Sequence, residues 1–262
     1  MKIILTGAGG LLGTSILKRI ASKYEVTSIV HKSGTSGLSC DIAEEAQVQT
    51  LLKNNRGDII IHCAAVTDVD FCENNPKIAH SVNCIGTRNL ACYSAMYGIT
   101  FIYISSDYVF DGRKQSPYRE DDDANPETVY GISKYGGELY VSYFTKKYYV
   151  FRTGLLYGAG PSCWIARITG KLKLKEDVYA AEDQVITPTY AEDFSAALDE
   201  FITKLCSGSK IAYGIYNLAN RGSVARYELA LKSAQYSSLP VSYTHLRAHE
   251  TVLDLVCRLL LE

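Results

Sequence analysis

The sequence has almost no net charge and no long apolar run. Its 27 Lys and Arg against 28 Asp and Glu leave a formal charge of −1, so no basic field exists to attract nucleic acid or anionic lipid. No apolar stretch approaches the roughly 20 residues that span a bilayer, and the apolar part of residues 1–7 is too short for a signal peptide. We therefore expect a cytoplasmic protein without nucleic-acid or membrane partners.

Paired-cysteine patterns are absent as well. The chain has 8 cysteines but no CxxC pair, and no Cys/His group has zinc spacing. This gives no reason to expect a metal site. Because no signal peptide is apparent, we expect the thiols to stay reduced and to pack as small apolar side chains.

The composition is that of a globular protein. Hydrophobic residues make up 47% of the 262 residues and charged residues 21%, which is ordinary for a folded chain able to bury a large core. Short apolar runs alternate with segments of helical periodicity. The expected strands are residues 2–6, 25–30, 58–63, 100–105, 148–152 and 215–218. The expected helices are residues 11–23, 43–54, 78–97 (opened by Pro76), 130–146, 191–205 and 224–234, with residues 164–174 mixed in character.

This alternation predicts an α/β fold. Strands that are apolar almost throughout are typical of a parallel sheet covered on both faces. With right-handed crossovers, the result is a doubly wound parallel sheet of the Rossmann type. The pattern loosens after Arg152, where we expect a smaller second lobe interleaved with the end of the sheet.

A glycine-rich turn follows the first expected strand. Gly7, Gly10 and Gly13 stand in the spacing G-x-x-G-x-x-G. The first glycine suits a tight turn, the second a close approach to a pyrophosphate, and the third close packing of helix on strand. The helix that starts at Leu11 and Leu12 offers free N–H groups and a positive dipole end to phosphates. A dinucleotide site is therefore predicted, although the same glycines could form a βα turn without a ligand.

The end of the second expected strand bears on the choice of dinucleotide. It reads Ile29-Val30-His31-Lys32-Ser33 and lacks the carboxylate that binds a ribose 2′-hydroxyl. Lys32, with Ser33 and secondarily His31, favours a 2′-phosphate and so NADPH over NADH. Asp41 and Ile42 could meet the adenine, but Asp41 could equally cap the next helix. Small side chains at the end of the third strand would let the cofactor cross it: Cys63, Ala64 and Ala65.

A tyrosine and a lysine share one face of a later expected helix. Tyr130 and Lys134 are four residues apart. A phenol has an ordinary pKa of about 10, and we expect the Lys134 ammonium to lower the pKa of Tyr130. Such a pair suits proton transfer in carbonyl/alcohol interconversion, and Lys134 could also bind the nicotinamide ribose. The spacing alone would also fit an ordinary helix face.

Polar residues follow the fourth expected strand. Ser106 lies just beyond its carboxyl end, where ligands bind in such folds. Its hydroxyl could polarise a substrate carbonyl and orient it towards Tyr130. Asp107 and Tyr108 could hold substrate hydroxyls, while a turn-forming role for Asp107 stays open.

These segments together resemble the extended short-chain dehydrogenase/reductases, and within them the dTDP-4-dehydrorhamnose reductase family. The resemblance extends in order over about residues 1–239. Beyond the motifs above, it is carried by residues 64–70, 82–90, 109–112, 116–121, 125–126, 137–138, 152–153, 183–184, 187–189 and 214–219.

The resemblance implies an NAD(P)H-dependent reductase of polysaccharide biosynthesis that reduces the 4-keto group of a 4-keto-6-deoxy nucleotide sugar. Tyr130 would donate the proton with Lys134 as its partner, and Ser106 would stand where Thr is more usual. By the same resemblance, Asp107, Tyr108 and Arg152 would contact the substrate. Two alternatives remain: a non-catalytic cofactor-binding subunit similar to the regulatory subunit of methionine adenosyltransferase, and a sugar-nucleotide epimerase or dehydratase. A homodimer is possible.

Two segments depart from the family pattern. Arg152-Thr153-Gly154-Leu155 replaces the more usual Arg-Thr-Ser-Trp, so an aromatic surface for the sugar is missing. Residues 240–262 resemble translated adapter sequence, with a native amphipathic helix as the alternative. We therefore divide the chain into a dinucleotide-binding domain (1–152), an incomplete substrate lobe (153–239) and a non-native tail (240–262).

Overall fold

The computed structural model describes residues 1–31, 37–160, 163–237 and 246–249. Its centre is a seven-stranded sheet in the order β11-β6-β5-β4-β1-β2-β3, and every pairing in it is parallel. The strands are β1 (Lys2–Thr6), β2 (Glu25–Val30), β3 (Leu38–Ser39), β4 (Ile59–His62), β5 (Thr100–Ser106), β6 (Tyr148–Thr153) and β11 (Gly214–Asn217). The strand order reverses between β1 and β4, which is the switch point of a Rossmann-type sheet. The predicted fold class is confirmed.

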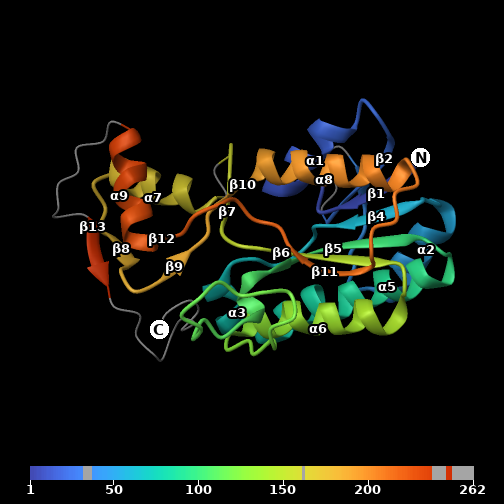
Figure 1. Cartoon of the computed structure of the whole chain (residues 1–262), viewed down its shortest axis with the longest axis horizontal. Helices are drawn as coiled ribbons and strands as arrows, with labels where there is room; N and C mark the ends of the chain where they lie inside the picture. The colour runs from blue at the N-terminus through green and yellow to red at the C-terminus, as the bar shows by residue number, and fades with distance from the viewer. Residues whose placement is uncertain (32–36, 161–162, 238–245, 250–262) are drawn as a thin grey trace.

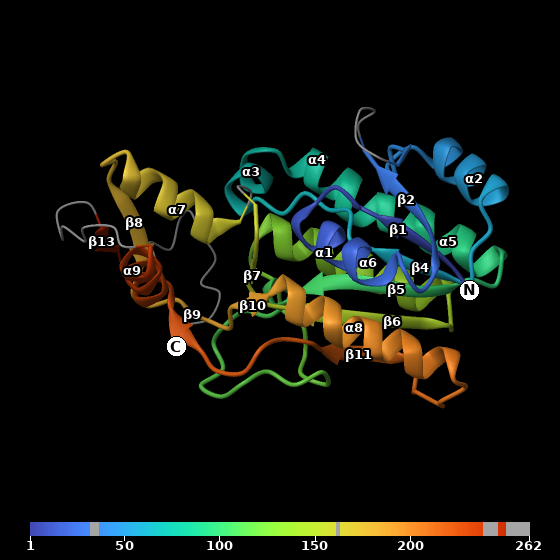
Figure 2. The ribbon, with the colours of Figure 1, turned by 90° about the horizontal axis from the view of Figure 1, so that it is seen from above.

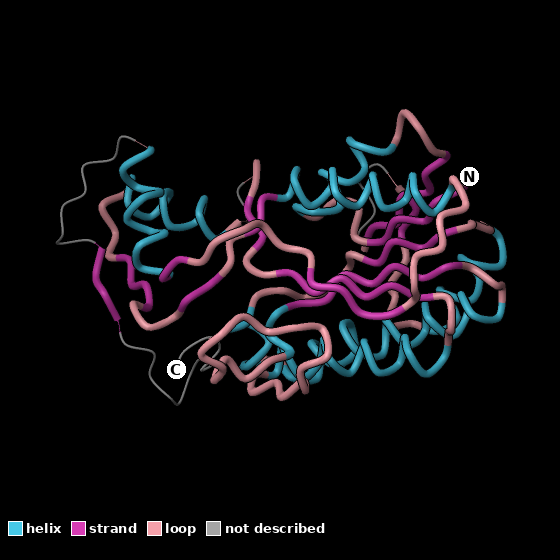
Figure 3. Tube along the Cα trace, viewed as in Figure 1, coloured by secondary structure: helices cyan, strands magenta, loops and turns pink. Residues whose placement is uncertain are grey.

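Helices cover both faces of this sheet (Figure 1). On one face lie α1 (Leu11–Ile20) and α8 (Ala191–Cys206), which pack on the apolar side chains of β1, β5 and β6. On the other face lie α2 (Glu45–Asn54), α5 (Thr87–Met96) and α6 (Val129–Phe144). Figure 3 shows the strands between these two helical layers. The two buried faces explain why the inner residues of the central strands, such as Ile3–Leu5 and Ile59–Ile61, are apolar.

The single helix expected over residues 78–97 is three segments. They are α4 (Pro76–Ala79), a π-helical turn (His80–Gly86) and α5. Asn83 lies in the π-helical turn, and its amide exchanges two hydrogen bonds with the Val66 backbone (2.7 and 2.9 Å). A π-turn re-aims one side chain within a helix, and here it aims Asn83 at the chain that leaves β4. A short helix, α3 (Val69–Asn74), was not predicted.

A second lobe lies beyond the carboxyl ends of the strands (Figure 2). It contains α7 (Trp164–Lys173), β8 (Val178–Ala181), β9 (Val185–Ile186), β12 (Val224–Ala225), α9 (Arg226–Tyr236) and β13 (Leu246–His249). Residues 164–174, expected to be mixed, are mostly helical, whereas the helix expected from Val224 begins at Arg226. Two short strands connect the lobe to the sheet, β7 (Leu156–Tyr157) and β10 (Thr189–Tyr190). Most of the segment 240–262 lies outside the described residues.

Within the described ranges, none of the helices combines the length and apolar character needed to cross a bilayer.

Candidate active site

The glycine turn lies at the switch point between β1 and β4. Gly7 has φ +70°, a conformation that favours glycine, and a Cβ there would come within 2.6 Å of the Ala64 nitrogen. A Cβ on Gly13 would overlap the Gly7 carbonyl oxygen. The turn thus lies directly against the chain that leaves β4, and both glycines are required by close backbone approach.

The amino end of α1 opens at this turn. Its N-cap is Gly10, with no side-chain cap hydrogen bond, and its first N–H groups have no partner within the helix. These donors, the helix dipole and the absence of side chains at the turn fit the diphosphate of a dinucleotide. Leu12 is buried in the core and Leu11 is partly buried beside it. Their contribution to the proposed site is therefore their backbone N–H.

The other residues expected to bind the cofactor differ in their exposure and in the contacts that they make. Cys63, Ala64 and Ala65 are partly exposed where β4 ends, as a ligand crossing the strand requires. Asp41 Oδ1 accepts from the Ala43 nitrogen (3.0 Å), so its side chain forms a turn two residues before α2 rather than capping it. Ile42 is buried and packs against Gly86, so its side chain is part of the core.

The structure describes only some of the residues that are expected to favour NADPH over NADH. His31 is exposed at the end of β2. Lys32 lies outside the described residues.

The helix that carries Tyr130 and Lys134 is fixed at its start. Thr128 is the N-cap of α6, and its hydroxyl accepts from the Gly131 nitrogen (3.0 Å). A Cβ on Gly131 would overlap the Tyr108 carbonyl oxygen, so the helix lies directly on the segment that follows β5. This contact brings the tyrosine helix to the serine at the end of that strand.

Ser106, Asp107, Tyr108 and Tyr130 form one cluster. Ser106 Oγ donates to Asp107 Oδ1 (3.0 Å) and accepts from the Tyr108 nitrogen (3.2 Å). The Tyr108 ring meets the Tyr130 ring edge-on at 5.4 Å between centroids. A hydrogen bond with Ser106 also acts on the Tyr130 phenol, whose pKa it lowers. Sequence motifs separated by more than 20 residues thus meet at one end of the sheet.

The electrostatics of Tyr130 differ from the sequence expectation. Burial raises the pKa of Tyr130 above its ordinary value, and the main opposing effect is the hydrogen bond with Ser106. Lys134 donates from Nζ to the Ile104 carbonyl (2.7 Å), and burial lowers the pKa of Lys134 to about 7. The expectation that Lys134 would lower the pKa of Tyr130 fails here because desolvation dominates and weakens the lysine's own charge. Tyr130 therefore holds its proton at neutral pH.

Asp107 is a perturbed carboxyl group beside the serine. Burial raises its pKa to about 6, against the opposing hydrogen bond from Ser106 and the charge of Arg226. Perturbed acids of this kind gather at functional sites. A Cβ on Gly154 would lie 3.2 Å from Asp107 Oδ2, so the glycine that departs from the family pattern lies beside this carboxylate.

Arg152 has a structural partner in Glu138. Its Nε and Nη2 donate to the two carboxylate oxygens of Glu138 (3.0 and 2.7 Å), and both side chains are nearly inaccessible. The guanidinium also lies 4.8 Å from the centroid of the Phe110 ring. This bidentate pair joins β6 to α6 beneath the candidate site. Arg152 nevertheless stands opposite Ser105 in the β5–β6 pairing, one residue from Ser106, and its Nη1 is buried without a hydrogen-bond partner among the described residues. The substrate contact expected of Arg152 stays a prediction.

Two further polar residues serve the cluster and were missed in the sequence. Asn83 Nδ2 donates to Ser133 Oγ (2.9 Å), so it ties the end of β4 to the helix of Tyr130. Arg226 Nη2 donates to the Tyr108 hydroxyl (2.9 Å) from the second lobe. Asn83 stands in a segment that carries the family resemblance, which was an available signal. Nothing local in the sequence singles out Arg226.

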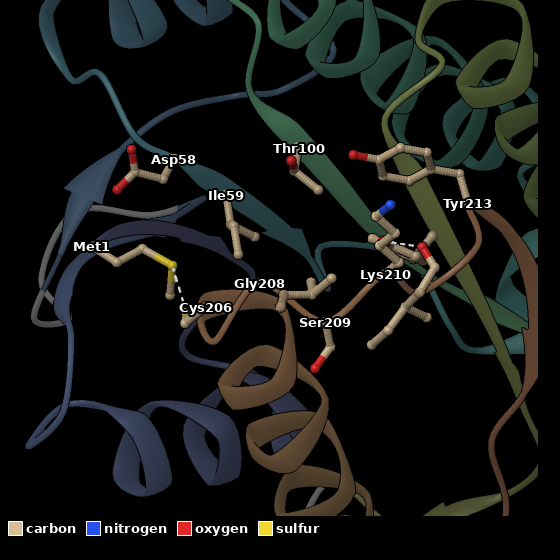
Figure 4. Close-up of a pocket in the computed structure, with 12 residues that line it drawn as sticks. Met1, Asp58, Ile59, Thr100, Cys206, Gly208, Ser209, Lys210 and Tyr213 are labelled. Carbon is tan, nitrogen blue, oxygen red and sulfur yellow. Dashed lines mark hydrogen bonds between the residues drawn. The ribbon is translucent and has the colours of Figure 1, made fainter.

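A separate cavity of about 460 Å³ lies at the opposite end of the strands, where β4 and β5 begin. Figure 4 shows Asp58 and Ile59 at the start of β4, Thr100 at the start of β5, and Lys210 and Tyr213 from the loop after α8. Parallel sheets of this type bind ligands at the carboxyl ends of their strands. The candidate active site is therefore the cluster around Ser106, at the carboxyl ends of the strands.

Comparisons with known proteins find a matching family and similar structures. The family described as RmlD substrate binding domain matches residues 1–251. The spore coat polysaccharide biosynthesis protein SpsK of Bacillus subtilis is 33% identical over 250 residues, covering 95% of this chain and 84% of that protein. A crystal structure of dTDP-4-dehydrorhamnose reductase from Bacillus anthracis in complex with NADP is 33% identical, with a TM-score of 0.84, and covers 95% of this chain and 85% of that chain.

A relative of another kind matches as well. Methionine adenosyltransferase 2 subunit beta of Xenopus laevis is 30% identical over 252 residues, covering 94% of this chain and 74% of that protein. The resemblance drawn from the sequence motifs is confirmed by the family match, which extends over nearly the whole chain. The chain belongs to the RmlD substrate-binding domain family.

Proposed function

We propose that this protein reduces the 4-keto group of a 4-keto-6-deoxy nucleotide sugar with NADPH, as a reductase of the dTDP-4-dehydrorhamnose type. The observation that carries the proposal is the cluster of Ser106 and Tyr130 at the carboxyl edge of the sheet, on which the glycine turn also opens. The similarity to a dTDP-4-dehydrorhamnose reductase solved with NADP supports both the reaction and the cofactor. NADH remains the alternative cofactor.

The glycine turn and the first N–H groups of α1 would hold the diphosphate of the cofactor, with Cys63, Ala64 and Ala65 beneath it. When bound, the nicotinamide supplies a hydride. Every other step belongs to side chains of this chain.

Ser106 and Tyr130 would act on the carbonyl oxygen. The Ser106 hydroxyl, which donates to Asp107 in this structure, rotates towards the substrate oxygen and polarises it. Tyr130 then gives its proton to the developing alkoxide. Its raised pKa suits a donor that must stay protonated until charge develops. Lys134 fixes the ribose side of the site and can resupply the proton.

The test is NADPH oxidation with a panel of 4-keto-6-deoxy nucleotide sugars. Tyr130→Phe should lower turnover at least about 100-fold, the order of a lost general acid, while the dissociation constant for NADPH stays within about twofold. Tyr143→Phe is the matched control, because Tyr143 lies on the same helix and is 77% exposed. Equal turnover in the two variants would remove Tyr130 from the mechanism.

A second candidate is a cofactor-binding regulatory subunit, favoured by the similarity to methionine adenosyltransferase 2 subunit beta. The same panel separates the two functions, because a regulatory subunit binds NADPH without oxidising it on any sugar. We further propose a cytoplasmic location, supported by the free thiols of all seven cysteines in the described residues. A homodimer stays a prediction.

A further inference from the structure

Arg226 reaches from the second lobe into the candidate active site. It is the first residue of α9, and its Nη2 donates to the Tyr108 hydroxyl (2.9 Å). Its guanidinium carbon lies 5.7 Å from the centroid of the Trp164 ring. Its Nε is buried and has no hydrogen-bond partner among the described residues. The guanidinium is therefore held in place but not satisfied.

The other arginine that links the lobe to the sheet domain is arranged differently. Arg167 of α7 donates to Asp68 Oδ2 (3.0 Å), and both side chains are about half exposed. That pair is an ordinary surface ion pair of small energetic value. Arg226 forms no ion pair within the part of the chain that the structure describes, and its bonded partner is a neutral phenol. A buried donor left unpaired is costly, so Arg226 Nε would gain from an oxygen of a ligand.

The position of Arg226 relative to the reacting groups indicates which ligand group it meets. The Tyr108 ring lies between Arg226 and Tyr130, because it bonds the first and meets the ring of the second edge-on. Asp107 lies close enough for the charge of Arg226 to lower its pKa against burial. The positive charge of Arg226 is thus separated from Tyr130, the proposed proton donor, by the Tyr108 ring.

We propose that Arg226 is a specificity-determining residue that binds the anomeric phosphate of the nucleotide-sugar substrate. This inference rests on the proposed function. In a pyranose, the phosphate-bearing carbon lies across the ring from C4. A sugar that presents C4 to Tyr130 therefore has its phosphate about one ring width from the proton donor, and Arg226 is separated from the same donor by the Tyr108 ring. In this structure Nε has no partner and Nη2 donates to the Tyr108 hydroxyl. On binding, each of the two nitrogens would donate to a phosphate oxygen instead. A planar guanidinium fits such bidentate recognition better than any other side chain.

The test measures binding of nucleoside diphosphates without the sugar. Isothermal titration of the NADPH-loaded protein with dTDP, UDP and GDP identifies the tightest ligand for the wild-type chain. Arg226→Gln should weaken that ligand at least tenfold, Arg226→Lys should weaken it less, and NADPH binding should stay within about twofold. Arg167→Gln is the matched control, because it removes another arginine contact between the lobe and the sheet and should leave diphosphate binding unchanged.

Tyr108→Phe separates recognition from a merely structural role. If Arg226 only held Tyr108, Tyr108→Phe and Arg226→Gln would act alike, and neither would change the binding of a ligand that lacks the sugar. On the present proposal Tyr108→Phe leaves diphosphate binding unchanged or tighter, because it removes the competing partner. Equal binding by wild type and Arg226→Gln overturns the assignment of Arg226 alone. Absence of diphosphate binding by the wild-type chain overturns the proposed function with it.

Discussion

The buried pair of Glu138 and Arg152 permits a quantitative prediction. Each side chain is about 4% exposed, and two hydrogen bonds of 3.0 and 2.7 Å join them in a bidentate fork. Glu138→Ala leaves the arginine charge buried without a counterion between α6 and β6. Removal of one partner from such a pair costs about 3–5 kcal/mol. For a chain of this size, that corresponds to a fall in melting temperature of roughly 6–20 °C.

The assay is urea unfolding followed by circular dichroism, with calorimetry for the melting temperature. The control is Glu200→Ala, which removes the exposed i,i+4 partner of Lys204 (2.7 Å) and should cost only about 0.3–0.5 kcal/mol. The double variant Glu138→Leu, Arg152→Met should recover most of the lost stability, because an apolar pair needs no counterion. A loss below about 1 kcal/mol for Glu138→Ala, or a double variant no better than the single one, would refute this reasoning.

Three further predictions concern the cofactor side of the site. Gly13→Ala should abolish NADPH binding in a fluorescence titration, because its methyl group would overlap the Gly7 carbonyl oxygen; retained affinity would show that the turn can shift. Since burial lowers the pKa of Lys134 from 10.5 to about 7, the unfolded chain binds a proton between these values that the folded chain does not. The free energy of unfolding should therefore rise with pH across that window, and Lys134→Met, compared by urea unfolding at several pH values, should remove that contribution. Lys32→Ala should weaken NADPH more than NADH if the sequence-based phosphate assignment holds, and an equal effect on both would reject it.

Local patterns predicted the parts of the molecule that depend on local chemistry. The apolar runs fixed the position of every strand of the main sheet except β3, which has only two residues. The glycine spacing and the pair of Tyr130 and Lys134 predicted which segments would meet, because parallel strands place their carboxyl ends on one edge. The π-helical turn at His80–Gly86 was not predictable in this way. It is accompanied by two hydrogen bonds between the Asn83 amide and the Val66 backbone, which follows another strand.

The remaining differences between prediction and structure come from burial and from contacts between residues far apart in the sequence. The ion pair of Arg152 with Glu138 was not predicted, because the sequence alone does not reveal that these two side chains face each other. The pKa of Tyr130 was expected to fall because the neighbouring lysine is visible in the sequence, whereas the burial of both groups is not. Arg226 was overlooked because its partner is 118 residues away. In each case the deciding quantity was desolvation or a contact set only by the folded chain.

The path of the chain between the sheet and the second lobe limits how the molecule can be divided. After β7 the chain enters the lobe, returns at β10 for α8 and the edge strand β11, and leaves again for β12 and α9. Helix α8 is tied to α1 by Ser15 Oγ, which donates to the Ala191 carbonyl (3.1 Å). A truncation before residue 191 would remove α8, whose Phe194 and Phe201 pack on Phe151 of β6, together with the lobe. We therefore expect the sheet and the second lobe to melt in a single cooperative transition.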